Sequence, residues 1–496
     1  MHIVTPEQMR NIEDNSEACG VSKRTLMINA GKKLAEIIDS HCNDDKKIVF
    51  LVGTGNNGGD CSVAAENLLD MGYKNISIVL VCGTPKTELA KEMYGRVSGR
   101  IDVSGNYQCI SEADIIVDGV FGTGFHGGLD KKISDIFALN ENAYRIAVDV
   151  PSGGNNHTGT VSDGTFRADE TVTFGFMKTG MTQYPLKDFC GKIIIADIGI
   201  PENACTVTER KYSLIERQSF PDFPPKRKSD SHKGNFGKIL IIAGSNNMRG
   251  AAYFAVSGAL RSGAGLVQLA TVGKCIDTVS ILAPEATFIE MSHDNNGFMQ
   301  FEPEKLDLEK YNAVVIGCGM GVTSETTELT KFVVENSEVP VIIDADGINC
   351  IASDIDILLK KKTDIILTPH VGEMSRLLKC TAAEISADRF SSAEYLAEKY
   401  GVTVVLKGAG TVIANSRNTA VNSTGNAGMS RGGSGDILSG IIGAIAGQGY
   451  SAFDSACIGA YLHGLAGDIA AENLTQEAML PRDIIDCLSD SFRKLK

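Results

Sequence analysis

Three loops in the first two hundred residues combine glycine with acidic and polar residues that can hold a phosphate or a cation. Gly53-Thr-Gly-Asn-Asn-Gly-Gly-Asp60 follows a predicted strand and opens a predicted helix, where backbone N–H groups bind phosphate. Asp118-Gly-Val-Phe-Gly-Thr-Gly124 and Asp149-Val-Pro-Ser-Gly153 each place an aspartate at a strand end. Ligands of open α/β sheets bind along that edge. The loops therefore predict one site with phosphate donors, carboxylates for proton transfer and oxygen ligands for a cation.

Each of these loops alone has a simpler explanation. A Gly-x-Gly-x-x-Gly turn can join a strand to a helix without a ligand, and a lone aspartate is often an N-cap or turn residue. A conventional dinucleotide site also needs an acidic residue after the next strand, but that strand ends Val81-Cys-Gly-Thr-Pro85. Three loops together favour a ligand site, although not an ordinary dehydrogenase site.

A second set of glycine-rich loops lies near the end of the chain. Gly432-Gly-Ser-Gly-Asp436 precedes the apolar run 437–446, so N–H groups at a helix start form an anion hole with a carboxylate at its edge. Lys407-Gly-Ala-Gly-Thr411 follows a predicted strand and offers a cation and a backbone nest for a nucleotide phosphate. It lacks the Walker A spacing. A flexible connector is the alternative for the 432–436 run.

Two series of strands must position these loops. The first has strands at 47–52, 76–81, 115–117 and 145–150, and the second at 238–243, 266–272, 313–316, 339–344, 364–368 and 402–406. Both alternate with helical stretches, which is typical of parallel α/β sheets. A proline-bearing, aperiodic stretch separates them. We therefore predict two α/β domains, 1–215 and 228–496, joined by a linker at 216–227.

Composition limits the functional classes. The chain has 496 residues, 43% of them hydrophobic, which is long enough for at least two cores. A formal charge of −14 argues against a nucleic-acid partner. Thirteen scattered cysteines without Cys-x-x-Cys pairs, and no leader or spanning run, predict a cytoplasmic protein without membrane attachment.

The first half resembles the NAD(P)H-hydrate epimerase family through Leu26-Met27-x-Asn29-Ala30-Gly31 and the three loops above, in the same order. This resemblance implies a Rossmann-like three-layer domain that interconverts the C6 epimers of hydrated NADH or NADPH, R to S, with bound K+. Cys61 and Ile28 depart from the family pattern. Cys61 replaces a glycine, the one residue freely permissive there.

The resemblance also implies site residues. The potassium ligands would be Asn57, Asp118 and Ser152, and Asp149 is our candidate acid/base. The substrate-binding residues would be Asn56, Asn57, Gly58, Gly59, Asp60, Gly122, Thr123, Gly124, Phe125, His126, Gly127, Gly128 and Asp149. Whether the ion is structural or catalytic stays open.

The second half resembles the ribokinase-like superfamily, and within it the ADP- or ATP-dependent NAD(P)H-hydrate dehydratases. The motifs that carry the narrower resemblance include Asp344-Ala-Asp-Gly347, Leu367-Thr-Pro-His370-x-Gly-Glu373 and Asn422-x-Thr-Gly-Asn426. The loop Gly317-Cys-Gly-Met-Gly321 has Cys318 where the family usually has proline, which leaves the rigidity of that turn open.

By this resemblance the second domain removes water from the S epimer at the expense of a nucleotide, giving AMP and phosphate if ADP is the donor. The nucleotide would lie on Lys407, Gly408, Ala409, Gly410, Thr411 and Gly435, and the hydrate on Ala252, Gly319, His370 and Asp436. Hydroxide is a poor leaving group, so phosphorylation of the C6 hydroxyl before its expulsion is a sensible route. Asp436 would accept the hydroxyl proton, and Mg2+ would bridge the nucleotide phosphates.

Two other functions remain open at this point. A ribokinase-like small-molecule kinase fused to a Rossmann-like regulatory domain explains the second site but leaves the first idle. A nucleotide sensor without catalysis would need neither Asp149 nor Asp436. The prokaryotic fusion that the chain resembles favours ADP as donor and hydrated NADH, hydrated NADPH and ADP as its small-molecule partners. We also expect a homo-oligomer.

Overall fold

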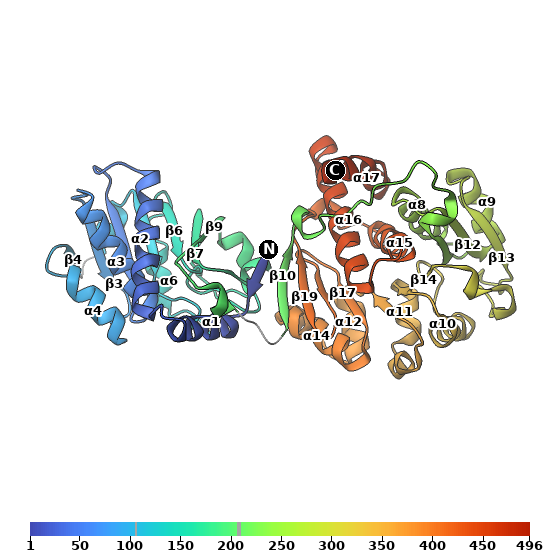
Figure 1. Cartoon of the computed structure of the whole chain (residues 1–496), viewed down its shortest axis with the longest axis horizontal. Helices are drawn as coiled ribbons and strands as arrows, with labels where there is room; N and C mark the ends of the chain where they lie inside the picture. Colours follow the sequence, from blue (N-terminus) through green and yellow to red (C-terminus); the bar gives the residue numbers. More distant parts are fainter. Residues whose placement is uncertain (105–106, 206–209) are drawn as a thin grey trace. The chain divides into compact units, whose positions relative to one another are not determined.

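The computed structural model describes residues 1–104, 107–205 and 210–496. The chain forms two compact units. His2–Tyr212 forms the first, the N-terminal unit, and Met1 with Ser213–Lys496 forms the second, the C-terminal unit (Figure 1). Both contain parallel sheets covered by helices, which confirms the predicted α/β class.

The N-terminal unit has a parallel sheet in the order β4-β3-β2-β5-β6-β7-β9. The short strands β1 and β8 pair with each other, also in parallel. The strands are β1 (His2–Val4), β2 (Ile48–Val52), β3 (Ile76–Leu80), β4 (Asp102–Ser104), β5 (Ile115–Gly119), β6 (Tyr144–Val148), β7 (Glu170–Phe174), β8 (Met177–Lys178) and β9 (Lys192–Ala196). The helices are α1 (Pro6–Ala18), α2 (Lys23–His41), α3 (Asn56–Asp70), α4 (Glu88–Val97), α5 (Gln108–Ser111), α6 (Lys131–Phe137) and α7 (Leu186–Phe189).

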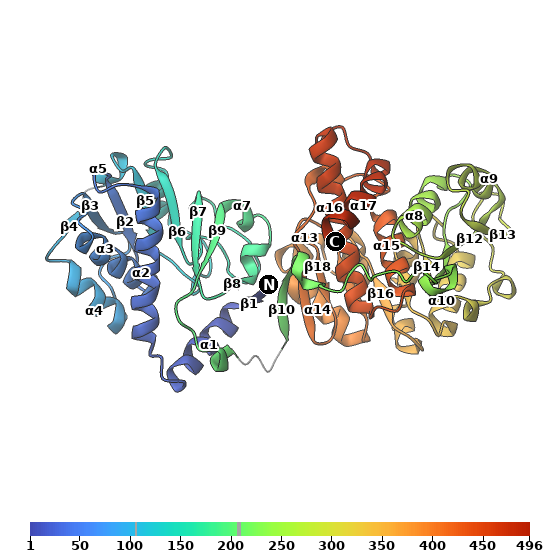
Figure 2. The ribbon, with the colours of Figure 1, turned by 45° about the horizontal axis from the view of Figure 1, so that its top comes forward.

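The central strand β2 shows why this sheet is covered on both faces. Its sequence Ile-Val-Phe-Leu-Val is buried throughout, as expected of a strand between two helical layers. Ile48 and Phe50 pack with the side chains of α2 and α3, whereas Val49 and Leu51 pack in a second cluster on the opposite face. Figure 2 shows α2 and α3 side by side on one face.

The C-terminal unit has its sheet in the order β13-β12-β11-β14-β15-β16-β17-β18-β19, followed by β10. The pairs from β13 to β17 are parallel, and β18 pairs antiparallel with both β17 and β19. The strands are β10 (Lys211–Ile215), β11 (Lys238–Ile242), β12 (Leu266–Val272), β13 (Thr287–Met291), β14 (Ala313–Ile316), β15 (Val341–Ile343), β16 (Ile365–Leu367), β17 (Thr403–Leu406), β18 (Val412–Ala414) and β19 (Asn418–Asn422).

The helices of this unit pack on the sheet and on one another. They are α8 (Arg249–Arg261), α9 (Gly273–Leu282), α10 (Ser324–Asn336), α11 (Ala345–Ile351), α12 (Val371–Leu378), α13 (Ala382–Ala387), α14 (Arg389–Tyr400), α15 (Ser434–Gly447), α16 (Ala452–Leu474) and α17 (Pro481–Leu495). Helices α8 and α15 approach closely, since a Cβ on Gly440 would lie 2.0 Å from the Ala255 carbonyl oxygen. Within the described residues, no helix has the length and apolar character needed to cross a bilayer.

The segment 216–227, expected as a linker, packs against the C-terminal unit. Phe223 is only 5% exposed and belongs to the cluster formed by α15, α16 and α17. Its ring centroid lies 5.8 Å from that of Phe492 and 5.8 Å from that of Tyr450. The compact units accordingly divide between Tyr212 and Ser213, ahead of the proline-bearing stretch.

Candidate active sites

The first site is a cavity of about 410 Å3 at the carboxyl ends of β2, β5 and β6. The register of the parallel strands brings the three glycine-containing loops to one edge, as the sequence predicted. Of the expected substrate-binding residues, those that line the cavity are Asn56, Asn57, Asp60, Gly122, Thr123, Gly124, Phe125 and Asp149.

The other expected residues of this site lie outside the cavity lining. Gly58 and Gly59 are buried in α3, where a Cβ would lie 2.5 Å from the Gly53 carbonyl oxygen or 2.9 Å from the Met27 side chain. The structure thus gives these two glycines a packing role. His126, Gly127 and Gly128 follow as an exposed stretch beyond the cavity.

Asp149 contacts a buried lysine that the sequence patterns did not single out. Lys178 on β8 is 1% exposed and donates hydrogen bonds to Asp149, to Thr173 Oγ1 at 2.9 Å and to the Phe174 carbonyl at 3.1 Å. Thr173 Oγ1 in turn donates to Asp149 Oδ1 at 3.2 Å. The backbone of Asp149 is left-handed, with φ of 66°, a strained conformation of the kind that collects at functional sites.

Two further carboxyl groups line the same cavity. Burial raises the pKa of Asp60 well above its ordinary value. Burial and the nearby Asp149 carboxylate also raise the pKa of Glu13, which comes from α1. The site therefore holds three carboxyl groups near the buried ammonium of Lys178, with Lys23 also in the cavity lining, an arrangement suited to proton transfer.

Of the residues expected to bind potassium, Asn57 lines the cavity, whereas Asp118 and Ser152 are buried outside its lining. Ser152 donates to Asp118 Oδ1 through its hydroxyl at 2.7 Å and to Oδ2 through its N–H at 2.8 Å. Burial raises the pKa of Asp118 to about 6, although these hydrogen bonds act in the opposite direction. Asn57 Nδ2 donates to the carbonyls of Phe121 and Val148 at 3.0 and 2.9 Å, which ties the α3 loop to the two aspartate loops.

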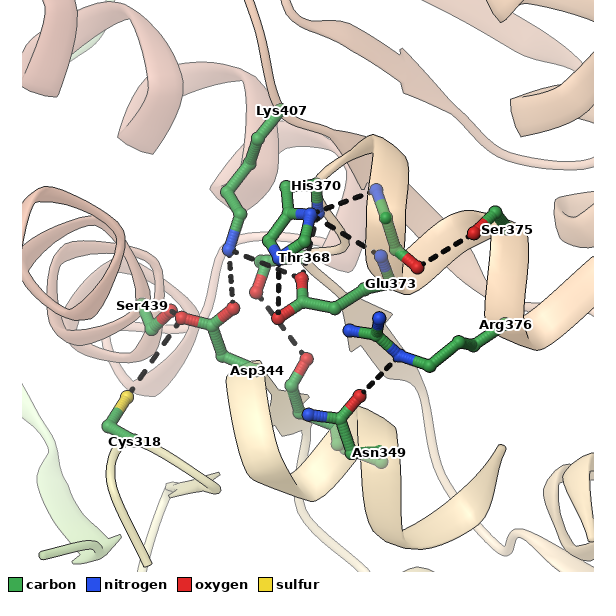
Figure 3. A network of polar contacts seen from close by, with 12 residues as sticks. Cys318, Asp344, Asn349, Thr368, His370, Glu373, Ser375, Arg376, Lys407 and Ser439 are labelled. Carbon is green, nitrogen blue, oxygen red and sulfur yellow. Dashed lines mark hydrogen bonds and ion pairs between the residues drawn. The ribbon is translucent and has the colours of Figure 1, made fainter. Parts of the chain in front are cut away.

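The second site forms where the ends of β14, β15 and β17 meet the start of α15. Lys407 Nζ donates to Asp344 Oδ1 at 2.6 Å, and Ser439 Oγ donates to Asp344 Oδ2 at 2.6 Å (Figure 3). Lys407 also lies 3.8 Å from Glu373. Asp436 joins Cys318 and Asp344 in a group whose ligand atoms all lie within 4.8 Å of one another.

The electrostatics of this second site follow from its carboxyl groups. Burial, reinforced by Asp344, raises the pKa of Asp436 to about 7. Burial opposes the charged form of Lys407, but Asp344 and Glu373 outweigh it, so the pKa of this lysine is raised. Asp436 therefore exchanges its proton near neutrality beside a fixed cation, as a general base requires.

An arginine side chain binds the backbone of the loop 407–411 and of the residue before it. Arg389 Nη1 donates to the carbonyls of Ala409 and Gly410 at 2.6 and 3.1 Å, and Nη2 donates to that of Leu406 at 2.9 Å. Gly408 and Gly410 adopt positive φ values of 151° and 62°. Because the carbonyls are committed to Arg389, the loop can turn its N–H groups to an anion.

The remaining expected residues surround this centre. His370 caps α12, since its Nδ1 accepts from the N–H of Gly372 at 2.9 Å, and its side chain lies 3.4 Å from Glu373. Gly319, with φ of 63°, lies against the start of α8, where a Cβ would be 2.7 Å from Ala251. Ala252 is fully buried on the same helix. Gly435 lies beside Lys407, because a Cβ there would be 3.3 Å from the lysine Nζ.

Sequence reasoning gave no role to several residues that the structure brings into the sites. Asp344 and Glu373 appeared only as parts of motifs, although a carboxylate at a strand end is a usable signal. Lys178 is a lone lysine among apolar residues, and Glu13 lies on an amphipathic helix with no local sign of function. Their positions depend on contacts between elements that are distant in the sequence.

Comparisons with known proteins identify relatives of both units. The profile of the family described as NAD(P)H-hydrate dehydratase matches residues 239–490. The profile of the family described as YjeF-related protein N-terminus matches residues 23–180. The bifunctional NAD(P)H-hydrate repair enzyme of Moorella thermoacetica is 34% identical over 524 residues, covering 100% of this chain and 97% of that protein.

Two solved structures match the C-terminal part. The ADP/ATP-dependent NAD(P)H-hydrate dehydratase of Bacillus subtilis, crystallised with ATP and Mg2+, is 28% identical with a TM-score of 0.51 and covers 58% of this chain and 100% of that one. A ribokinase-like superfamily protein of Enterococcus faecalis is 26% identical with a TM-score of 0.50 and covers 57% of this chain and 96% of that one.

Proposed function

The chain belongs to the bifunctional NAD(P)H-hydrate repair enzymes, and we propose that Asp149 with Lys178 performs the epimerisation and Asp436 the proton transfer of dehydration. The enzyme repairs hydrated NADH and NADPH by epimerising the hydrate and dehydrating it with ADP or ATP. The kinase alternative is not favoured, because full-length relatives carry the repair name over both units. We assign epimerisation to 1–215 and dehydration to 228–496.

The observation that carries the first assignment is the buried contact between Asp149 and Lys178 at the cavity wall. Inversion at C6 requires the C–O bond to break and re-form, or the ring to open and close, and either route moves one proton to and from oxygen. Asp149 can take and return that proton, while Lys178 stabilises its carboxylate between transfers. Asp60 and Glu13 supply further proton sites around the ligand.

The oxygen-bearing residues at the base of the three loops fit a potassium ion. Asn57 Nδ2 donates hydrogen bonds to two carbonyls, so its Oδ1 can bind a cation. Asn156 Oδ1 is buried without a hydrogen-bond partner within the described chain, while its Nδ2 donates to the Gly122 carbonyl. With the oxygens of Asp118 and Ser152, these groups are hard donors of the kind that alkali cations prefer. Bound K+ would order the loops and set the charge near the substrate phosphate.

The observation that carries the second assignment is the carboxyl group of Asp436 at the first turn of α15, next to Lys407 and Asp344. Asp436 accepts the C6 hydroxyl proton, and the oxygen attacks the terminal phosphorus of the nucleotide. With ADP, the bond to AMP breaks. The C6–O bond of the phosphorylated hydrate then breaks, phosphate leaves with the electron pair, the ring nitrogen shares its lone pair, and loss of the C5 proton restores NAD(P)H.

The nucleotide fits the surroundings of Lys407. We place the phosphates on the loop 407–411, whose Ala409 and Gly410 carbonyls are bound by Arg389, and beside Gly435, where a Cβ would lie 3.3 Å from Lys407 Nζ. The oxygens of Asp344 and Asp436 suit Mg2+, whereas the thiol of Cys318 does not, because Mg2+ selects oxygen ligands. Mg2+ would neutralise phosphate charge during transfer. We propose that Ala252, Gly319 and His370 border the hydrate.

Compartment and assembly are also proposals. All thirteen cysteines are free, which supports a reducing compartment such as the cytoplasm. Localisation of the tagged full-length protein tests this. A homo-oligomer stays a prediction, for which size-exclusion chromatography with light scattering is the measurement.

The function is tested with a mixture of both NADH-hydrate epimers. We expect the full-length protein with K+, Mg2+ and ADP to restore the dihydronicotinamide absorbance completely. Without nucleotide, it should equilibrate the epimers but restore no absorbance. Parallel reactions with ATP and with NADPH hydrate compare the donors and substrates. Complete restoration in the absence of any nucleotide would overturn the proposed phosphoryl-transfer route.

A further inference from the structure

A second cavity, of about 620 Å3, lies in the C-terminal unit away from the dehydratase site. It is bordered by the ends of α8, α15 and α17 and by the segment 223–227. Figure 1 shows this green segment crossing the unit towards α8. The volume is that of a small-molecule site. None of the residues assigned above to the dehydratase site lines it.

The cavity carries a concentration of positive charge in an acidic protein. Lys226, Arg227, Arg261 and Lys496 line it, and no aspartate or glutamate is found among its described lining residues. Lys226 and Arg261 are exposed and make no ion pair or hydrogen bond within the described parts of the chain. Arg227 donates to the Gly263 carbonyl at 3.0 Å and stacks 3.9 Å above Phe236, which fixes its position.

The helix dipole explains only part of this charge. A cation in the last turn of a helix is favourable, and Arg261 is the last residue of α8. Lys226 and Arg227 belong to another segment, and Lys226 neutralises no carboxylate in the described structure. Four cations converge from three segments, since Lys496 follows α17, and together they create a positive potential that favours an anionic ligand with several charges.

Ser262 provides an independent sign of a missing partner. It lines the cavity, is 2% exposed, and its hydroxyl has no hydrogen-bond partner among the described residues. Buried hydroxyl groups in folded proteins nearly always have a partner. The serine hydroxyl can donate to a phosphate oxygen that Lys226 and Arg261 neutralise.

Another wall of the cavity is aromatic. Phe223 and Phe492 line the cavity with ring centroids 5.8 Å apart and ring planes inclined by 37°. Phe223 is buried, whereas Phe492 is partly accessible. A ligand with a planar apolar part and a polyanionic part would match both walls.

From these contacts we infer a second nucleotide site in the C-terminal unit, which binds a nucleoside polyphosphate with its phosphates on Lys226, Arg261 and Ser262 and its base against Phe492. The site is separate from the dehydratase site. Helix α15 begins at the anion hole and ends next to this cavity, and its fourteen residues span about 21 Å. Helix α8 likewise runs from the substrate region to Arg261.

The test is the stoichiometry of ADP binding to the full-length protein, measured by isothermal titration calorimetry. We expect Lys226→Gln/Arg261→Gln to lose one binding site per chain, or to weaken it at least tenfold, while the dehydration kcat at saturating ADP stays unchanged. Lys228→Gln/Lys362→Gln removes the same charge from exposed positions outside the cavity and should keep wild-type stoichiometry. Equal stoichiometry together with equal affinities in the wild type and the cavity variant would overturn the proposal.

Three further measurements locate the ligand, its chemistry and the role of Ser262. An azido-ADP photolabel should modify segments 223–227 or 481–495 in the wild type but not in the cavity variant. Inorganic tripolyphosphate should compete for the second site, and adenosine alone should not; competition by adenosine only would contradict recognition of the phosphates. Ser262→Ala should weaken the second site severalfold without lowering the unfolding free energy. Loss of stability with unchanged affinity would remove the hydroxyl from the proposed site.

Discussion

Replacing Asp436 by asparagine should abolish dehydration and leave epimerisation intact. The substitution keeps the shape of the side chain but removes the proton acceptor beside Lys407 and Asp344. Because the carboxyl group has a pKa of about 7 owing to burial and the Asp344 charge, it alternates between protonated and ionised forms at neutral pH. An amide cannot do so.

The magnitude follows from the role of a general base. Loss of such a group costs roughly 10²- to 10⁴-fold in rate. In the wild type the reactive form is the carboxylate, so kcat/KM for dehydration should fall about tenfold per pH unit below pH 7 and level off above it. At pH 5, about one molecule in a hundred would carry the ionised group. Asp344→Asn should move this acid limb to lower pH, because the like charge that raises the pKa of Asp436 is removed.

Although Asp436→Asn should abolish dehydration, it should not lower the stability of the folded protein at neutral pH. The folded-state pKa of Asp436 lies above its unfolded value of about 3.8, so the folded protein binds the proton more tightly. Its contribution favours folding below pH 4 and is lost as the pH rises towards 7. Asp436→Asn should therefore be no less stable than the wild type at pH 8, as is common when a catalytic group is removed.

The assay is recovery of dihydronicotinamide absorbance from purified S-epimer hydrate with ADP, measured from pH 5 to 8. Epimer interconversion is followed separately by chromatography. Asp364→Asn, an exposed carboxylate in the same unit, is the matched control and should behave as wild type. A folded Asp436→Asn protein with wild-type dehydration, or a wild-type profile that is flat between pH 5 and 7, would refute the assignment.

Four other outcomes are expected. Asp149→Asn, which keeps a residue tolerant of the left-handed backbone, should stop epimerisation, so that a mixed hydrate with ADP is half consumed at early time points; interconversion at the wild-type rate would contradict the role of Asp149. Lys178→Met should lose epimerisation, and its free energy of unfolding in urea should fall by about 3–5 kcal/mol, because the Asp149 carboxylate stays buried without its partner. Adding Asp149→Asn should restore stability but not activity. Exchange of K+ for choline should slow epimerisation severalfold and leave dehydration of the S epimer unchanged; equal loss of both activities would argue against an ion confined to the first site. The fragments 213–496 and 228–496 should both dehydrate the S epimer, but the shorter one lacks Phe223 and should be about 3 kcal/mol less stable, and equal unfolding midpoints would show that Phe223 packing contributes little.

Local sequence signals were sufficient for the fold class and for most of the loops that form the sites. Alternating apolar strands and helices specify parallel α/β units, and parallel strands bring their carboxyl ends to one edge. For this reason the strand pattern alone predicts that Asn57, Asp118 and Asp149 lie together, and the structure brings them to one region. The glycine-rich start of α15 likewise predicted where Asp436 would lie.

The sequence alone does not distinguish glycines needed for close packing from glycines that contact a ligand. Gly58 and Gly59 belong to the loop motif, yet the structure places both against neighbouring side chains and backbone within α3. A glycine that permits close packing and one that approaches a phosphate look alike in a single sequence. The segment after residue 215 was predicted as a linker from its prolines and lack of periodicity. The burial of its Phe223 has no local signal, because it depends on helices more than two hundred residues away.

The sequence by itself determined the element types, the order of the two units and the polar loops at the strand ends, since these depend on periodicity and local backbone preference. Only the tertiary structure decided which charges meet. Lys178 reaches Asp149 because β6, which Asp149 follows, pairs with β7, which leads into β8. Asp344 meets Lys407 because β15 and β17 lie in one sheet. The same long-range packing of α8, α15, α17 and the segment 223–227 creates the basic cavity. Such contacts are set by how complete elements pack, and no short stretch of sequence specifies them.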